Sequence, residues 1–113
     1  MIEAVLYREG ETLTGFRARG HSGYAEAGSD IVCAGVSVLG CTCVNALESL
    51  LGIRVRLKGN EEGLLDFDLP PLSGEKEKGA RLLMGALGQG MSDLQESYPG
   101  YVHFEIKERR KSR

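Results

Sequence analysis

A single apolar run, residues 31–47, restricts the possible folds of this chain more than any other feature. Asp30 precedes the run as a good N-cap residue and Gly52 follows as a helix stop, so the pattern predicts a helix over 31–51. The run contains three polar residues and three cysteines, whereas a membrane span needs ~20 strongly apolar residues. We therefore expect no membrane segment. We expect instead a central helix that is covered on most sides, in part by a second subunit.

The remaining segments predict five strands and a second helix. Alternating apolar and polar residues mark the strands, and a helical stripe of leucine, alanine and methionine marks the helix. The predicted strands cover 2–8, 12–20, 53–58, 64–69 and 101–107, and the second helix covers 75–97. Val102, Phe104 and Ile106 are expected to form the buried face of the last strand. A turn is expected over 59–63. The order ββαββαβ predicts a two-layer α+β fold, a mostly antiparallel sheet with two helices, in a single domain, 1–113.

Charge and cysteine content exclude several functional classes. With 14 Lys and Arg against 16 Asp and Glu, the net charge is −2, which excludes a nucleic-acid footprint over the whole domain. The basic C-terminal tail, 107–113, is interpreted as a solvated end, with weak contact to RNA or another acidic partner as the alternative. The N-terminal residues show no export signal, and three cysteines in such a chain argue against disulfides. We therefore expect a cytoplasmic protein with reduced thiols.

Cys33 is the candidate nucleophile because of its place at the start of the predicted helix. If Asp30 is the N-cap, Cys33 is the third helical residue. There the positive end of the helix dipole and unpaired backbone N–H groups favour the thiolate. The N–H groups of Cys33 and Ala34 are then candidate donors to an oxyanion formed during acyl transfer. The alternative interpretation makes Cys33 an ordinary small residue of the core.

A cysteine nucleophile needs a base, and the chain offers two histidines. His21 lies where the second predicted strand enters a glycine-rich loop, 22–29. Because this loop leads back to Asp30, the His21 ring can approach Cys33. His103 points away from the apolar face of the last strand and is interpreted as an exposed or structural histidine. Asp30 either orients His21 as a third catalytic member or caps the helix, and the capping role is preferred.

The other two cysteines do not indicate a metal site. Cys33 and Cys41 are eight residues apart, hence roughly 12 Å along a helix axis. That separation is too large for one zinc ion with bonds of about 2.3 Å. We expect no metal and no cofactor, and we interpret Cys41 and Cys43 as buried structural thiols. Ser37, one turn after Cys33, either bonds to its own helix backbone or helps to line a pocket.

Two segments, GHSGYA at 20–25 and GSDIVCAGVS at 28–37, together resemble the bacterial ribosomal-processing cysteine protease family, Prp. The length of the chain and the order of its elements agree with this resemblance. It implies a small cytoplasmic cysteine endopeptidase, typically a homodimer. It also implies the substrate, a large-subunit ribosomal protein, number twenty-seven in the bacterial series, whose N-terminal extension is removed. The family histidine falls on His21 and the nucleophilic cysteine on Cys33. Ser22 departs from the alanine common in the family, a small change that is not expected to disturb catalysis.

The residues around this pair are expected to contact the peptide substrate. They are Gly20, Ser22, Gly23, Tyr24, Ala34 and Ser37. The loop 22–29 is expected to act as a lid, in which Tyr24 either contacts the substrate or anchors the loop. Two alternatives stay open. One is a non-catalytic ribosome-associated binding protein that uses the basic tail, and the other is a thiol redox sensor built on Cys33.

Overall fold

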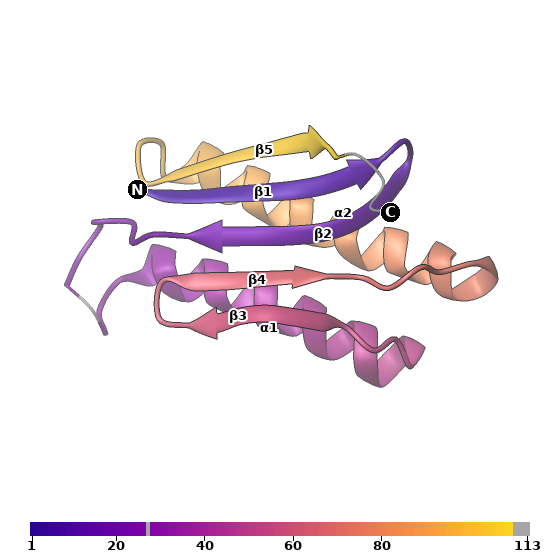
Figure 1. Cartoon of the computed structure of the whole chain (residues 1–113). Coiled ribbons are helices and arrows are strands. Elements are labelled where there is room, and N and C mark those ends of the chain that lie inside the picture. Colours follow the sequence, from indigo (N-terminus) through magenta and orange to yellow (C-terminus); the bar gives the residue numbers. More distant parts are fainter. Residues whose placement is uncertain (27, 110–113) are drawn as a thin grey trace.

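The structure, a computed structural model, describes residues 1–26 and 28–109, which form two helices and five strands. Their order is β1 (Ile2–Glu9), β2 (Thr12–Arg19), α1 (Ile31–Leu51), β3 (Arg56–Glu61), β4 (Leu64–Asp68), α2 (Gly74–Ser97) and β5 (Val102–Glu108). The order ββαββαβ confirms the predicted α+β fold. Figure 1 shows both helices behind one face of the sheet, so the other face is open.

The five strands form one mixed sheet in the order β3-β4-β2-β1-β5. Only β1 and β5 are parallel, and the other neighbours are antiparallel. The parallel pair arises because α2 carries the chain back along the sheet between β4 and β5. Arg19 at the end of β2 pairs with Leu64 at the start of β4. This register places the β3–β4 hairpin beside the loop that leads from β2 into α1.

The first helix has the predicted ends but not the predicted cover. It begins after Asp30 and ends before Gly52, whose left-handed φ of 65° closes it. Val32 and Leu47 on its inner side are fully buried in the core, whereas Val38 on its outer side is 63% exposed. α1 is long and apolar enough to cross a membrane, but the core helices of soluble proteins often are too. Of its most apolar stretch, 28% is buried inside the protein. The prediction of a helix covered on most sides is therefore wrong for the single chain, because a two-layer fold covers only one side.

The two helices approach each other closely through glycines. A Cβ on Gly90 would lie 2.8 Å from Cδ1 of Leu39, and a Cβ on Gly79 would lie 2.7 Å from Cδ2 of Leu51. These leucines of α1 therefore fill the notches that the α2 glycines leave open. Leu39, nearer the start of α1, meets the glycine nearer the end of α2, and Leu51 at the end of α1 meets the earlier glycine. The two helices are therefore antiparallel. Some of the 16 glycines of the chain thus serve helix packing rather than turns.

The β3–β4 hairpin differs from its prediction. β3 begins at Arg56 instead of residue 53 and continues to Glu61, through the segment that was expected to turn. Glu61 already pairs with Leu64, so the turn consists of residues 62–63 alone. Gly59, an apparent turn residue, lies inside β3, where a Cβ would come within 2.8 Å of Cδ2 of Leu64. The glycine makes room for a neighbouring side chain, and this role has no signature in the local sequence.

The buried face predicted for the last strand is only partly correct. Val102 is buried, Phe104 is partly buried, and Ile106 is 50% exposed. β5 is an edge strand of the sheet. The cover that α2 gives to this face therefore decreases along the strand, and the alternating pattern of the sequence does not reveal that decrease.

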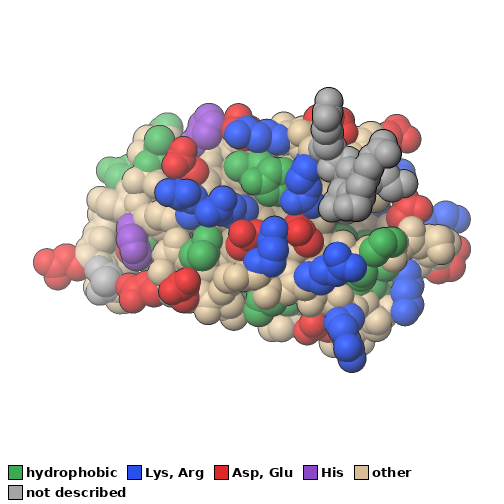
Figure 2. All heavy atoms as spheres, in the orientation of Figure 1, with side chains coloured by type: hydrophobic (Ala, Val, Ile, Leu, Met, Phe, Trp, Pro, Cys, Tyr) green, Lys and Arg blue, Asp and Glu red, His purple; other side chains and the backbone are tan. Residues whose placement is uncertain are grey.

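The start of the basic tail is held on the open face of the sheet. Arg109 Nη1 donates to Asp68 Oδ1 at 3.1 Å, Nη2 donates to Thr14 Oγ1 at 2.9 Å, and the guanidinium lies 4.5 Å from the centre of the Tyr7 ring. The interpretation of 107–113 as a solvated end is therefore wrong for 107–109, because one side chain bridges three strands. Residues 110–113 lie outside the described residues. Figure 2 shows how charged side chains gather on this face.

Candidate active site

Asp30 organises the first turn of α1. Its backbone is extended, with φ −83° and ψ 102°, and its Oδ1 accepts hydrogen bonds from the N–H groups of Val32 and Cys33, each 3.0 Å long. A side-chain oxygen that satisfies these otherwise unpaired N–H groups defines an N-cap. The capping role predicted for Asp30 is therefore confirmed, and Cys33 occupies the third helical position as expected.

The second carboxylate oxygen of Asp30 binds the preceding loop. Oδ2 accepts the hydroxyl of Ser22 and, at 3.4 Å, the N–H of Ala25. The Ser22 bond is the largest cause that lowers the pKa of Asp30 from 3.8 to about 2, against an opposing effect of burial. Asp30 is therefore charged at neutral pH. Among the described residues, His21 is not a hydrogen-bond partner of Asp30, so the geometry gives no support to the orienting role.

Cys33 is half-buried and lies in the first turn of α1. The backbone N–H of Ser22 donates to Cys33 Sγ at 3.4 Å. The sulfur therefore has a backbone donor at the N-terminal end of α1, which is the positive end of the helix dipole. Cys33 is therefore not an ordinary core thiol: its sulfur reaches a pocket and has a polar partner.

The oxyanion donors predicted from the sequence are already occupied. The N–H of Cys33 donates to Asp30 Oδ1, and the N–H of Ala34 donates to the Asp30 carbonyl oxygen at 3.0 Å. Asp30 thus satisfies the two donors that were predicted to be unpaired. The prediction that these two groups hold an oxyanion is therefore not met by this arrangement.

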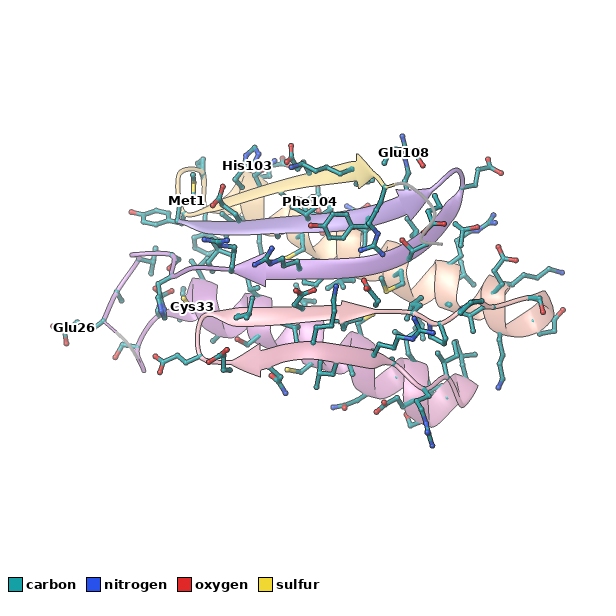
Figure 3. The ribbon with its side chains drawn as sticks, viewed as in Figure 1. Met1, Glu26, Cys33, His103, Phe104 and Glu108 are labelled. Carbon is teal, nitrogen blue, oxygen red and sulfur yellow. The ribbon has the colours of Figure 1, made fainter. Side chains whose placement is uncertain are left out.

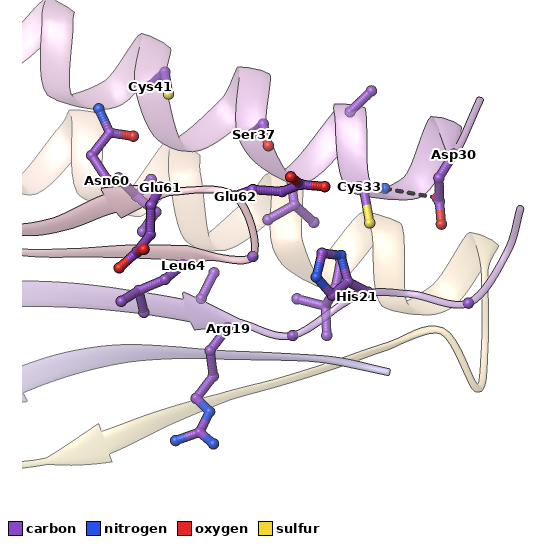
Figure 4. A pocket seen from close by; sticks show the side chains of 18 of the residues that line it. Arg19, His21, Asp30, Cys33, Ser37, Cys41, Asn60, Glu61, Glu62 and Leu64 are labelled. Carbon is purple, nitrogen blue, oxygen red and sulfur yellow. Dashed lines mark hydrogen bonds between the residues drawn. The ribbon is translucent and has the colours of Figure 1, made fainter. Parts of the chain in front are cut away.

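His21 follows β2 and faces the same space as Cys33. Gly20, with φ 100°, packs so closely on Met1 that a Cβ would lie 2.7 Å from the Met1 carbonyl oxygen. On the other side, a Cβ on Gly63 would lie 3.0 Å from Nε2 of His21. Glycines before the histidine and on the facing hairpin thus leave room for the imidazole. Figure 4 shows the ring beside the Cys33 sulfur.

His103 is not part of this arrangement. Its side chain is 54% exposed, and its Nε2 lies 3.9 Å from a carboxylate oxygen of Glu105. Figure 3 places His103 on the edge strand β5, apart from Cys33. The expectation of an exposed histidine on this strand is confirmed.

A pocket of about 600 Å³ contains both members of the pair. Four of the six predicted substrate contacts line it, namely Gly20, Gly23, Ala34 and Ser37. Apolar residues of the sheet and of α1 also contribute, which are Ile2, Ala18, Val36, Leu64 and Leu65. The pocket therefore combines an apolar wall with a thiol and an imidazole, the usual mixture of apolar lining and a few polar groups in a binding site.

The other two predicted substrate contacts hold the loop instead. Ser22 is only 4% exposed and does not line the pocket. The Tyr24 ring meets the rings of Tyr98 and Tyr101 edge to face, with centroids 5.5 Å and 5.2 Å away. Of the two roles considered for Tyr24, the structure shows the anchoring one. The role of the loop 22–29 as a lid stays a prediction.

Sequence reasoning missed one wall of the pocket. Asn60, Glu61, Glu62 and Gly63 of the β3–β4 hairpin line it opposite α1. Nothing in these residues indicates a site, because their place depends on β4 pairing with β2. Two carboxylates thus stand beside the pocket, which gives this wall an acidic character.

The remaining cysteines differ from each other. Cys43 is buried, and burial raises the pKa of its thiol to about 11, whereas Cys41 is exposed. The interpretation of a buried structural thiol is therefore confirmed for Cys43 and wrong for Cys41, which is exposed and lines the pocket. Within residues 1–26 and 28–109, no group of three or more His, Cys, Asp or Glu side chains is placed to hold a metal ion.

Comparison with known proteins agrees with this chemistry. The profile described as cysteine protease Prp matches residues 1–103. The chain belongs to the Prp family of cysteine proteases. It is 32% identical over 101 residues to the ribosomal processing cysteine protease Prp of Bacillus subtilis (strain 168), which covers 87% of this chain and 90% of that protein. This Prp family member is therefore a peptidase.

Solved structures show the same fold. The Streptococcus mutans protein SMU.848, known from a crystal structure, is 32% identical in sequence to this chain. The match covers 96% of both chains, with a TM-score of 0.79. The essential ribosomal processing protease Prp from S. aureus, in complex with a covalently linked product peptide, has a TM-score of 0.85. It is 24% identical and covers 95% of this chain and 100% of that one.

Proposed function

We propose that this Prp family member removes the N-terminal extension of a large-subunit ribosomal protein, number twenty-seven in the bacterial series, with Cys33 as nucleophile and His21 as base. The observation that carries the catalytic assignment is the shared pocket, in which the sulfur at the start of α1 faces the imidazole. The B. subtilis relative is a ribosomal processing protease, which supports the choice of substrate class.

The proposed reaction has two steps. His21 takes the thiol proton as Cys33 Sγ attacks the scissile carbonyl carbon, and the C=O electron pair moves onto the oxygen. When the C–N bond breaks, His21 gives that proton to the leaving amine, and a thioester remains on Cys33. Water then attacks the thioester and gives one proton to His21. The C–S bond breaks, the carboxylic acid product leaves, and the proton returns to the sulfur.

The proposal extends to the assembly and its location. We place the enzyme in the cytoplasm as a homodimer. The outer side of α1 supports the dimer, because Ile31 and Val38 lie two turns apart on that side and are 54% and 63% exposed, and exposed apolar residues that lie together mark interaction sites. Sedimentation of the wild type and of Val38→Asp tests the assembly, and the variant is expected to be monomeric. Cell fractionation tests the location.

Incubation with the extended ribosomal protein, read by mass spectrometry, tests the activity. The wild type is expected to yield one shortened product and the released peptide. Cys33→Ala and His21→Ala are expected to yield neither while keeping the wild-type circular dichroism spectrum. His103→Ala, the matched control for a lost imidazole, is expected to cleave normally. Cleavage by Cys33→Ala would reject the nucleophile, and an intact precursor with active enzyme on other peptides would reject the substrate.

A further inference from the structure

Ser22 and Asp30 are the two polar residues that the described part of the chain buries, at 4% and 8% exposure. The Ser22 hydroxyl donates to Asp30 Oδ2 and accepts the N–H of Tyr24 at 3.0 Å. A buried hydroxyl with both a donor and an acceptor partner is held in one orientation. The backbone of Ser22 is therefore fixed against the cap of α1.

Asp30 and Ser22 also contact Cys33, one at its backbone N–H and the other at its sulfur. Asp30 Oδ1 accepts the Cys33 N–H at 3.0 Å, while the Ser22 N–H donates to Cys33 Sγ at 3.4 Å. The Ser22–Asp30 bond joins these two contacts into a closed ring of hydrogen bonds. The backbone and the sulfur of Cys33 thus share one support, and the Ser22 hydroxyl closes it.

We infer that Ser22 is a positioning residue for the nucleophile: its hydroxyl, bonded to Asp30, keeps its own N–H directed at the Cys33 sulfur and so favours the thiolate. The inference rests on the proposed role of Cys33. It follows from the occupancy of the first-turn donors, since Val32, Cys33 and Ala34 all give their N–H groups to Asp30. Among the described residues, the hydrogen bond to the sulfur comes from the Ser22 N–H.

The charge of Asp30 strengthens the need for this donor. A carboxylate close to the sulfur opposes a second negative charge there. The hydrogen bond from the Ser22 hydroxyl disperses the negative charge of the Asp30 carboxylate. The Ser22 N–H counters the repulsion that this charge exerts on a negatively charged sulfur. Loss of the hydroxyl therefore removes two contributions of the same sign, and both losses disfavour the thiolate.

The test compares Ser22→Ala with Ser22→Thr, which keeps the hydroxyl, both in a Cys41→Ser background. The rate of Cys33 alkylation by iodoacetamide is measured against pH, together with kcat/KM on a cleavable peptide. Ser22→Ala is expected to move the alkylation profile to higher pH and to lower kcat/KM at pH 7 about 10-fold. Ser22→Thr is expected to restore both. An unchanged profile in Ser22→Ala overturns the inference even if activity falls.

A measurement on the wild type guards against a variant that does not fold. The Ser22 amide resonance in nuclear magnetic resonance spectra is expected to shift with pH as Cys33 ionises, and to lose this shift in Cys33→Ser. If the Ser22 amide shift does not follow the ionisation of Cys33, the inference is overturned. The alkylation profile and the amide shift need no substrate, so failure to cleave the precursor would reject the proposed function and leave this inference standing.

Discussion

Arg109 gives a test of whether a residue near the chain end contributes to the stability of the sheet. Its guanidinium contacts Asp68, Thr14 and Tyr7 on three different strands, at 3.1, 2.9 and 4.5 Å. Its side chain is 30% exposed, so solvent weakens these contacts without abolishing them. Arg109→Ala removes all three contacts and leaves the backbone hydrogen bond from Arg109 N to the carbonyl of Arg8 in place.

The expected loss follows from the separate contacts. At this exposure the ion pair and the hydroxyl contact are each worth about 0.5–1 kcal/mol, and the cation–π contact adds about 0.5–1 kcal/mol. Asp68 keeps Lys58 as a partner at 3.0 Å, so no unpaired charge is left behind. We therefore expect a loss of about 2 kcal/mol, or a decrease in Tm of roughly 8 °C for a domain of this size.

Urea unfolding followed by circular dichroism measures the effect. Arg109→Lys is expected to recover less than half of the loss, because an ammonium group cannot serve a carboxylate, a hydroxyl and a ring at once. Arg8→Ala is the matched control. Its partner Glu108 lies 3.5 Å away with both side chains more than half exposed, so we expect a change within about 0.5 kcal/mol. Equal stability of the Arg109→Ala and Arg8→Ala variants would refute the reasoning.

Three further predictions concern the site. Because the pKa of Asp30 is lowered from 3.8 to about 2, its stabilising effect is complete above about pH 4 and is lost as pH falls through 2. Asp30→Asn should therefore be less stable than the wild type in urea at pH 7, and a gap that persists at pH 2 would contradict this. Because burial raises the pKa of Cys43 to about 11, a thiol reagent at pH 8 should label Cys43 only after denaturation. Gly63→Ala, with φ 80° and a Cβ 3.0 Å from the His21 ring, should lower kcat/KM about 10-fold, whereas Gly10→Ala, with φ 64° and nothing within 4 Å, should not.

The parts of the fold that were predictable depend on local signals. Asp30 as cap and Gly52 as stop are short-range features, so the bounds of α1 and the third-residue position of Cys33 follow from the sequence. The loop between His21 and Asp30 is short enough to return the chain, and this brings the imidazole near the sulfur. The order of elements likewise follows from local alternation and periodicity.

The parts that were missed depend on partners distant in sequence or on a choice between hydrogen bonds. The hairpin wall of the pocket requires β4 to lie beside β2, which no residue of 60–63 indicates. Arg109 lies in a segment whose composition resembles a free end, and its role depends on Thr14 and Asp68. The N–H groups of Cys33 and Ala34 were expected to hold an oxyanion, but they bond to the side chain and the carbonyl oxygen of Asp30. Ser22 was expected to be a neutral change because its hydrogen bonds to Asp30 and Cys33 depend on how the loop folds back on α1.

The close approach of Met1 to Gly20 has a practical consequence for any fusion protein. The residue after Gly20 is the candidate base, so a peptide joined ahead of Met1 would emerge next to the pocket. Figure 3 shows Met1 and Cys33 toward one end of the molecule and Glu108 toward the other. A purification handle attached upstream would compete with peptides for the site and depress the measured turnover, whereas the same handle attached downstream would leave the entrance clear.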